Sequence, residues 1–316
     1  MGYKLAGCDV IGCCEIDKRM NEIYKKNHNP KYNYLMDIRE FNQISNNELP
    51  KELFSLDILD GSPPCTTFSM SGLREKSWGK KKKFKEGQAE QTLDDLSFVF
   101  IDTVEKLKPK CVIMENVEGL LQGQAWDYVQ RIYKGFAQIN YQVKHYLLKG
   151  EYMGIPQTRH RVFFIAFRND VNFDFDALDM IFDYEPIPYG KVKEGVGEPA
   201  STLATEMLNK AKHCDLCFRD IYVRLGERPH WFSAQIAWEE NVLKTITAKC
   251  EQYRGTEKTK LSTIDVIHCQ TFPEDYDFLS TAFSRIGYVC GMSVPPIMIK
   301  RIVTRIIETG VFENGK

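Results

Sequence analysis

Residues 61–69, with the sequence GSPPCTTFS, hold a cysteine at a position suited to chemistry. The preceding run, Leu56–Leu59, is apolar with one acid and predicts a short buried strand, which the glycine and two prolines end abruptly. Open α/β sheets bind their ligands at the carboxyl ends of strands, so a Cys65 thiolate there could act as a nucleophile. The alternative for a single cysteine is an inert core side chain, because free cysteine is among the most buried residue types.

Two further groups could complete a site around this thiol. Glu115 and Asn116 follow the strand expected over Cys111–Met114, and a glutamate there could hold a heterocyclic base or move a proton. Arg159 and Arg161 share one face of an extended segment, where guanidinium groups suit a phosphate or a carbonyl oxygen that gains negative charge. Taken alone, the acid could begin a solvated loop, and the arginines could be a charged strand edge.

Acidic residues also end two earlier predicted strands. Glu15 and Asp37 stand where a doubly wound sheet binds ligands, and a carboxylate there can accept the hydroxyls of a ribose or the amino group of an adenine. Strand-ending acids also commonly serve as turn or helix-cap residues, so either reading is open for each acid alone.

These groups need a scaffold, and the first half of the chain predicts one by alternating apolar runs with segments of helical spacing. Leu96–Leu107 is the clearest helix, and residues 161–166 form a further apolar strand. Repeated strand-then-helix units predict an α/β fold with a doubly wound, mostly parallel sheet. We expect a catalytic and cofactor-binding domain over 1–167, a smaller irregular domain over 168–243, and a return segment over 244–316 whose helix begins near Pro295.

Composition narrows the class of protein. The chain has 316 residues, 43% of them hydrophobic and 27% charged, which is ordinary for a globular protein. We expect no membrane span, because no run of about 18 apolar residues occurs. The ten cysteines form no disulfide-like framework and the first residues lack a signal-peptide pattern, so we expect reduced thiols and a cytoplasmic location. A net charge of −1 implies that a nucleic acid would be held by local basic patches.

The motifs, taken together and in order, resemble the cytosine-C5 DNA methyltransferases over essentially the whole chain. They are Pro64-Cys65, Glu115-Asn116-Val117 and Gln157-x-Arg159-x-Arg161, followed by GYVCGMSVPP at 287–296, which is similar to the family's last motif. The resemblance implies the sheet of S-adenosylmethionine-dependent methyltransferases, with 168–243 as a target-recognition domain.

The resemblance also implies a mechanism. A cytosine is flipped out of duplex DNA, and the Cys65 thiolate adds to its C6 atom. Glu115, next to Asn116, contacts the ring N3 and the exocyclic amine, and C5 takes the methyl group of S-adenosylmethionine. Arg159 steadies the cytosine carbonyl oxygen and Cys65, and Arg161 supports the site.

The same resemblance implies contacts to cofactor and DNA. S-Adenosylmethionine would be held by Glu15, Ile16, Asp37, Ile38, Pro64 and Leu96. Met292 stands where the family usually has asparagine, and Ser293 could compensate near the cofactor. The DNA contacts expected are Ser69, Lys80, Lys81, Lys82 and Lys83 in a loop, and Arg219 and Arg224 in the recognition region, with Arg228, Lys249 and Arg254 as further candidates.

Cys214 and Cys217 form one C-x-x-C pair in the recognition region. A single pair without a second one is poor evidence for zinc, so we expect no metal.

One departure from the family concerns the start of the fold. The family opens with a strand and a glycine-rich F-x-G-x-G-G turn, whereas residues 1–8 are similar to the helix that follows it. That strand is central in the sheet, and its loss would leave backbone groups of two neighbouring strands unpaired. We expect that Met1 is an internal methionine or that another polypeptide supplies the strand.

Three functions therefore stand at this stage. The first is a prokaryotic or phage DNA cytosine-C5 methyltransferase, associated with the nucleoid and paired with a cognate restriction enzyme or solitary. The second is a catalytically silent DNA-binding fragment, or one subunit of a split enzyme. The third, a tRNA cytosine-C5 methyltransferase of the same kind, is disfavoured by the substantial recognition region.

Overall fold

The sheet-forming part of the protein carries most of the predicted site residues. The computed structural model describes residues 1–63, 96–227 and 234–313, and the chain divides into two units. The unit we call the sheet unit comprises residues 10–148, 160–180 and 304–316, and the second unit comprises residues 1–9, 149–159 and 181–303.

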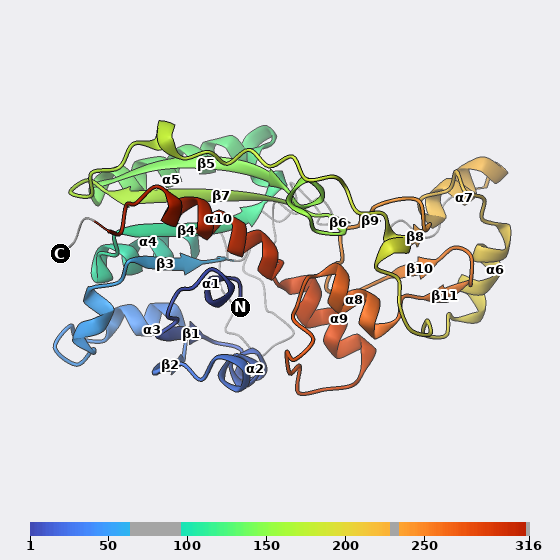
Figure 1. Ribbon diagram of the computed structural model, residues 1–316, viewed down its shortest axis with the longest axis horizontal. Helices are drawn as coiled ribbons and strands as arrows, with labels where there is room; N and C mark the ends of the chain where they lie inside the picture. The colour runs from blue at the N-terminus through green and yellow to red at the C-terminus, as the bar shows by residue number, and fades with distance from the viewer. Residues whose placement is uncertain (64–95, 228–233, 314–316) are drawn as a thin grey trace. The chain divides into compact units, whose positions relative to one another are not determined.

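In the sheet unit, strands and helices alternate as the sequence predicts (Figure 1). The strands are β1 (Gly12–Glu15), β2 (Tyr32–Leu35), β3 (Ile58–Gly61), β4 (Cys111–Val117), β5 (Tyr141–Lys149) and β7 (His160–Arg168). The helices are α2 (Lys18–His28), α3 (Ile38–Gln43), α4 (Leu96–Leu107) and α5 (Trp126–Gln138), with short 3₁₀ turns η1 (Lys51–Phe54), η3 (Glu118–Leu121), η4 (Gly123–Ala125) and η6 (Phe175–Ala177).

Local sequence sets the ends of these helices. The Asp17 carboxylate accepts the backbone N–H groups of Arg19 and Met20 and so caps α2, which ends at Asn29 in the left-handed conformation. Asp37 caps α3 in the same way by accepting the N–H of Arg39. The predicted helix over Leu96–Leu107 is confirmed as α4.

The core of the sheet unit lies between β4, β7 and two helices. Val112 and Met114 of β4 and Phe164 of β7 are fully buried with residues of α4 and α5. The runs Cys111–Met114 and 162–167 are buried without interruption, as expected for strands covered on both faces. β3 and β4 are parallel, whereas β7 pairs with β4 in the antiparallel sense.

The described strands form two sheets in this unit instead of one. β1 pairs in parallel with β2, and a separate four-stranded sheet has the order β3-β4-β7-β5. In Figure 1, β1 and β2 lie on the far side of β3 from β4.

The second unit contains short elements. Its helices are α1 (Gly2–Leu5), α6 (Thr202–Lys210), α7 (Phe218–Leu225), α8 (Thr263–Cys269) and α9 (Phe283–Met292), with the turns η5 (Gly150–Met153) and η7 (Tyr189–Lys191). Its strands are β6 (Gln157–Thr158), β8 (Gln235–Ala237), β9 (Leu243–Lys244), β10 (Gln252–Arg254) and β11 (Thr259–Lys260). β6 pairs with β9, and a three-stranded sheet has the order β11-β10-β8.

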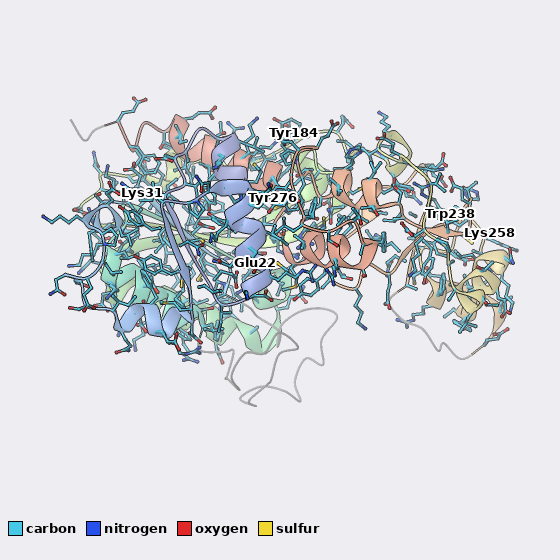
Figure 2. All side chains as sticks on the ribbon, turned by 90° about the horizontal axis from the view of Figure 1, so that it is seen from below. Glu22, Lys31, Tyr184, Trp238, Lys258 and Tyr276 are labelled. Carbon is cyan, nitrogen blue, oxygen red and sulfur yellow. The ribbon has the colours of Figure 1, made fainter. Side chains whose placement is uncertain are left out.

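A small core of its own supports the region around α6 and α7. Phe218 of α7 stacks on Tyr253 of β10, and Trp238 donates its indole N–H to the Asp215 carbonyl, 2.8 Å away. Figure 2 shows Trp238 in this part of the chain, between strands and helices. The core of this region therefore includes a residue beyond 243, Tyr253.

One stretch, Phe283–Glu308, is long and apolar enough to cross a membrane by length and composition. It consists of two helices, α9 and α10 (Pro296–Glu308), which Ser293, Val294 and Pro295 separate. Half of the tested window is buried inside the protein. A helix break and an interior environment are typical of core helices, so we assign these two helices to the folded core.

Candidate active site

Glu115 and Arg161 form an ion pair across two neighbouring strands. Arg161 Nε lies 2.8 Å from Glu115 Oε1, and the two side chains are only 15% and 14% exposed. Arg161 also donates from Nη1 to the carbonyl of His160 at 2.7 Å. The pairing of β4 with β7 causes this geometry, because Glu115 lies opposite Phe163 and Val117 opposite Arg161. Partial exclusion of water strengthens the attraction between the two charges.

Asn116 is buried next to Glu115 in sequence but points to the other face of the sheet, because side chains alternate along a strand. Its Oδ1 accepts the backbone N–H of Val117 at 2.9 Å. Its Nδ2 has no hydrogen-bond partner within the described part of the chain. A buried amide donor without a partner is costly, so this group is available to a ligand or to another segment.

Arg159 lies in the second unit. The residue as a whole is only 1% exposed. Nη1 donates to the Ile246 carbonyl at 2.8 Å, and Nη2 donates to the carbonyls of Gly291 and Ser293 at 3.0 and 2.7 Å. These three acceptors come from two segments that are distant in sequence. Arg159 therefore holds the segment after β9 and the end of α9 together.

Gln157 is a second buried hub that the sequence motif contained but to which no role was given. Its Nε2 donates to the Cys269 carbonyl at 2.6 Å and to Gln270 Oε1 at 2.8 Å, and its Oε1 accepts the N–H of Ile246 at 3.0 Å. The sequence held a signal for this role: Gln157 lies two residues before Arg159, and side chains at that spacing lie on the same face of an extended segment.

The acids Glu15 and Asp37 lie at the ends of β1 and β2, which are parallel neighbours. Glu15 is opposite Leu35, and Asp37 comes two residues after that strand. Glu15 Oε1 accepts the N–H of Asp17 at 2.9 Å, and Asp37 Oδ1 accepts the N–H of Arg39 at 2.8 Å. Both acids and the following residues, Ile16 and Ile38, are half-buried. The second carboxylate oxygen of Asp37 lies 3.4 Å from Arg39 Nη1, so this acid pairs with the side chain of the residue whose N–H it caps.

The sequence motifs assign no role to Asp60 in β3. It is solvent-exposed, yet enough protein surrounds it that desolvation raises the pKa of its carboxyl. The signal in the sequence was an acid inside an apolar strand, one residue before Gly61. Two cysteines of β1 share this environment: burial, together with the Glu15 charge, raises the pKa of Cys13 to about 11 and that of Cys14 to about 12.

Several predicted site residues lie outside the described residues. These are Pro64, Cys65, Ser69, Lys80, Lys81, Lys82, Lys83 and Arg228. Leu96 is described, and it is buried at the start of α4. The chain leaves β3 at Gly61, which is paired with Met114, the residue before Glu115.

Ser293 and Met292 end α9 in the second unit. The Ser293 hydroxyl donates to the Val289 carbonyl at 2.7 Å, and Met292 is 59% exposed. The proposed compensation by Ser293 stays a prediction.

Arginines of the recognition region differ in their surroundings. Arg219 is exposed, whereas Arg224 is held 2.7 Å from Asp215 and donates to the Lys210 carbonyl. Burial is the largest single influence on Asp215 and opposes its ionisation, but the hydrogen bonds from Arg224 and the Lys212 N–H, together with the charges of these two residues, outweigh it and lower the pKa of that carboxyl. Arg254 is 3% exposed and is paired with Asp265 at 2.7 Å, so it is not available as the DNA contact that the sequence suggested.

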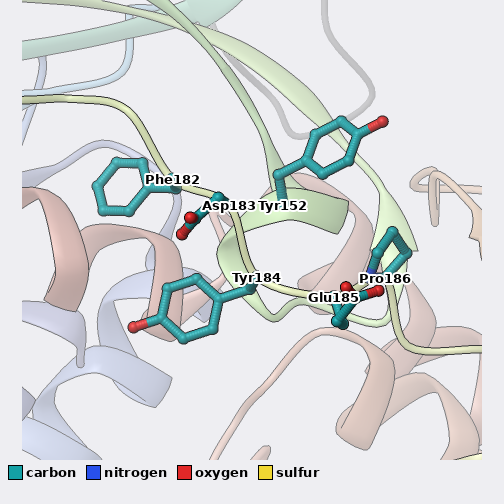
Figure 3. A pocket seen from close by; sticks show the side chains of 6 residues that line it. All are labelled: Tyr152, Phe182, Asp183, Tyr184, Glu185 and Pro186. Atoms are coloured by element: carbon teal, nitrogen blue, oxygen red, sulfur yellow. The ribbon is translucent and has the colours of Figure 1, made fainter.

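No group of three or more histidine, cysteine or acidic side chains in the described residues could hold a metal ion. A pocket of about 420 Å³ lies in the second unit (Figure 3). Its lining is aromatic and acidic, with Tyr152, Phe182, Asp183, Tyr184, Glu185 and Pro186. The Arg301 guanidinium lies over the Tyr184 ring, 3.4 Å from its centroid.

Comparison with known proteins places these motifs in context. The model of the C-5 cytosine-specific DNA methylase family matches residues 1–308. The type II methyltransferase M.FnuDI of Fusobacterium nucleatum is 28% identical, over 98% of this chain and 91% of that protein. The type II methyltransferase M.NgoPII of Neisseria gonorrhoeae is 23% identical, over 98% and 92%.

A solved structure shows the same fold. A DNMT2 variant of Spodoptera frugiperda superposes with a TM-score of 0.65 at 17% identity, over 97% of this chain and 95% of that one. The expected α/β fold of the methyltransferase type is therefore confirmed.

Proposed function

The chain belongs to the C-5 cytosine-specific DNA methylase family and is a DNA cytosine-C5 methyltransferase, and we propose that it acts through a covalent bond between Cys65 and a flipped-out cytosine. The Cys65 thiolate adds to C6, and the electron pair moves to C5, which takes the methyl group. Loss of the C5 proton and departure of the thiolate then restore the aromatic ring. Flipping is required because C5 and C6 cannot be reached inside the base stack.

The observation that carries this proposal is the ion pair of Glu115 with Arg161 at the end of β4. β3 and β4 are parallel neighbours with Gly61 opposite Met114, so the chain leaves β3, four residues before Cys65, beside the strand end that holds Glu115. A Glu115 oxygen that accepts the cytosine amine would orient the ring while Oε1 holds Arg161. A developing negative charge on the base is stabilised by a fixed cation in a partly dry site.

We assign different roles to the two arginines. Arg161, beside Glu115, is the guanidinium that would reach the cytosine carbonyl oxygen. We assign Arg159 a positioning role through Nη1 and Nη2, which donate to backbone carbonyls of the second unit. This assignment reverses the roles that the resemblance implied. Asn116 would fix the end of β4 through the Val117 N–H.

The residues present fit S-adenosylmethionine as the methyl donor. When bound, this cofactor supplies a methyl group on a positively charged sulfur. Glu15 and Asp37, half-buried on adjacent parallel strands, would accept the ribose hydroxyls and the adenine amino group. Ile16, Ile38 and Leu96, with Pro64, would cover the adenine, and Ser293 would lie near the cofactor.

Duplex DNA is the proposed substrate. Ser69 and Lys80, Lys81, Lys82 and Lys83 would contact its backbone, and Arg219 would contact it from the recognition region, since this side chain is exposed. The matched relatives are named type II methyltransferases, and we propose the same restriction–modification setting, in the cytoplasm, for this chain.

A specific observation supports a second candidate function, that of one subunit of a split enzyme. The separation of β1–β2 from the four-stranded sheet favours a subunit that needs another polypeptide for full activity.

A mechanism-based trap tests the proposal. Duplex DNA that carries 5-fluorocytosine, incubated with protein and S-adenosylmethionine, should give a covalent adduct because the fluorine cannot leave as a proton does. The Cys65→Ser variant, with near-identical volume, is the matched control and should give none. Wild-type protein that gives no adduct across mixed-sequence DNA would contradict the covalent mechanism. Competition with tRNA in the same assay separates the third function considered above.

A further inference from the structure

The pocket of the second unit gathers exposed aromatic side chains. Among the described residues, only three phenylalanine, tyrosine or tryptophan side chains are exposed, and two of them, Tyr152 at 44% and Tyr184 at 48%, line this pocket. The N–H of Tyr184 donates to the Tyr152 carbonyl at 3.0 Å, which fixes the two residues relative to each other. Phe182 lines the pocket as well, and Figure 3 shows its ring and that of Tyr184 on the same side of their segment. Exposed rings around a hollow are typical of a binding site.

Two carboxylates give the pocket its charge. Asp183 and Glu185 line it and are exposed, and in the described part of the chain no cation is paired with either of them. Residues 181–190 contain these two acids and no lysine or arginine. The two carboxylates outnumber the single guanidinium of Arg301, which lies over the Tyr184 ring. The pocket therefore attracts a cation and repels a phosphate group of DNA.

One guanidinium group already stacks on a ring of this pocket. The Arg301 guanidinium lies 3.4 Å from the centroid of the Tyr184 ring, and a Cβ atom at Gly154 would come within 2.8 Å of Arg301 Nη2. Burial lowers the pKa of Arg301, and its Nη1 has no hydrogen-bond partner within the described residues. Desolvation opposes this placement, so the contact with the ring face is what favours it. The rings of the pocket are therefore suited to a planar cation.

We propose that this pocket binds the guanidinium group of an arginine side chain presented by a partner protein. A guanidinium is planar and weakly hydrated, so it can contact the aromatic rings while it donates to the Asp183 and Glu185 carboxylates. A Mg²⁺ ion would need oxygen ligands on all sides and would gain nothing from the rings. A volume of about 420 Å³ is typical of pockets for ligands larger than one ion, so a peptide segment fits. This inference rests on the pocket and not on the proposed catalysis.

Calorimetric titration of the 316-residue protein tests this proposal. The probe is the peptide Ala-Arg-Ala with blocked ends, and its matched control is Ala-citrulline-Ala, which has nearly the same shape but no charge. The pocket variant combines Asp183→Asn with Glu185→Gln. The matched control variant combines Asp275→Asn with Glu274→Gln, which removes the same charge from two exposed acids elsewhere in the second unit.

We expect wild-type protein to bind the arginine peptide about tenfold or more tightly than the citrulline peptide, and the pocket variant to lose this preference. The control variant should bind as wild type does. Tyr184→Leu removes the ring but keeps both carboxylates, and it should weaken binding by about fivefold or more. Equal affinity for the two peptides, or unchanged affinity in the pocket variant, would overturn the proposal. So would methylguanidinium or spermidine that binds as tightly as the arginine peptide, because a free small cation would then be the occupant.

Discussion

Arg159 and Arg161 carry the same guanidinium group but are held by different partners. Arg161 is bound to a carboxylate in a half-buried site, and Arg159 is bound to three backbone carbonyls in a buried one. Substitutions at the two positions should therefore separate catalysis from stability.

Removal of the Arg161 charge should affect catalysis most. We expect Arg161→Ala to lower the rate of methyl transfer by about 100-fold or more, because a fixed cation beside the reacting base is lost. Arg161→Lys keeps the charge but not the planar fork, so it should recover only part of the rate. Single-turnover transfer of radiolabelled methyl groups to DNA measures this. A rate unchanged in Arg161→Ala would remove this residue from the site.

Removal of the Arg159 side chain should affect stability most. We expect Arg159→Ala to lower the free energy of unfolding by about 3 kcal/mol or more, because three buried carbonyls lose a charged donor. Denaturant titration measures the loss, and single-turnover rates at low temperature, where the variant stays folded, should remain near wild type. An Arg159→Ala protein of normal stability and lost activity would indicate direct contact with the base.

The roles of these arginines could not be read from their spacing alone. Two residues at i and i+2 share a face only when one continuous strand contains both. Here β6 ends at Thr158 and β7 begins at His160, so Arg159 lies in a break. The sequence predicts that both arginines take part in a site. Their different roles depend on the break between β6 and β7, which no local sequence pattern indicates.

At the scale of elements, β3 and α4 approach each other closely at Gly61. A Cβ atom at Gly61 would lie 2.5 Å from Cε2 of Phe100, which is 4% exposed and cannot move away freely. We expect Gly61→Ala to cost about 1–3 kcal/mol of stability through overpacking. Phe100→Leu in the same chain should relieve part of this cost. A double-mutant cycle by thermal melting measures the coupling, and strictly additive costs would exclude the contact as their cause.

The same strand gives stability a pH dependence through Asp60. Desolvation raises the pKa of this carboxyl in the folded protein above its ordinary value of 3.8. As pH rises above that value, the folded state binds more protons than the unfolded state, so the free energy of unfolding falls. Asp60→Asn should therefore raise the melting temperature at pH 7, and the gain should shrink towards pH 4.

Asp57→Asn is the control for this effect. Asp57 is exposed and paired with Lys110 at 2.8 Å, so its substitution should lower the melting temperature slightly or leave it unchanged. A gain in Asp60→Asn of equal size at pH 4 and pH 7 would show that packing, and not ionisation, is responsible.

Elements were more predictable than their pairing. The limits of α4 and the buried run at Cys111–Met114 follow from periodicity and a proline stop. The antiparallel sense of β7 against β4 does not, because both strands are buried on both faces and read as uninterrupted apolar runs. Strand direction depends on connections between elements, which residue patterns do not encode.

At the scale of the whole molecule, the chain passes between the two units at five places, so neither unit is one continuous segment. The predicted recognition domain, 168–243, ends before the middle strand of its own sheet. β10 lies between β8 and β11, and Tyr253 of β10 packs on Phe218. The buried Arg254 is paired with Asp265 and donates to the hydroxyl of Tyr189.

These contacts predict which fragment can fold. We expect a fragment of residues 186–270 to melt cooperatively, because it keeps the three-stranded sheet and both partners of Arg254. A fragment of residues 168–243 should show no cooperative transition, because it loses β10 and leaves the apolar side chains around Phe218 exposed to water. Calorimetry of the two fragments, with near-ultraviolet circular dichroism of Trp238, measures this. A matched variant, Arg254→Met in the longer fragment, should melt at a lower temperature, because Asp265 is then buried without its partner. A cooperative transition in 168–243 would restore the boundary at 243.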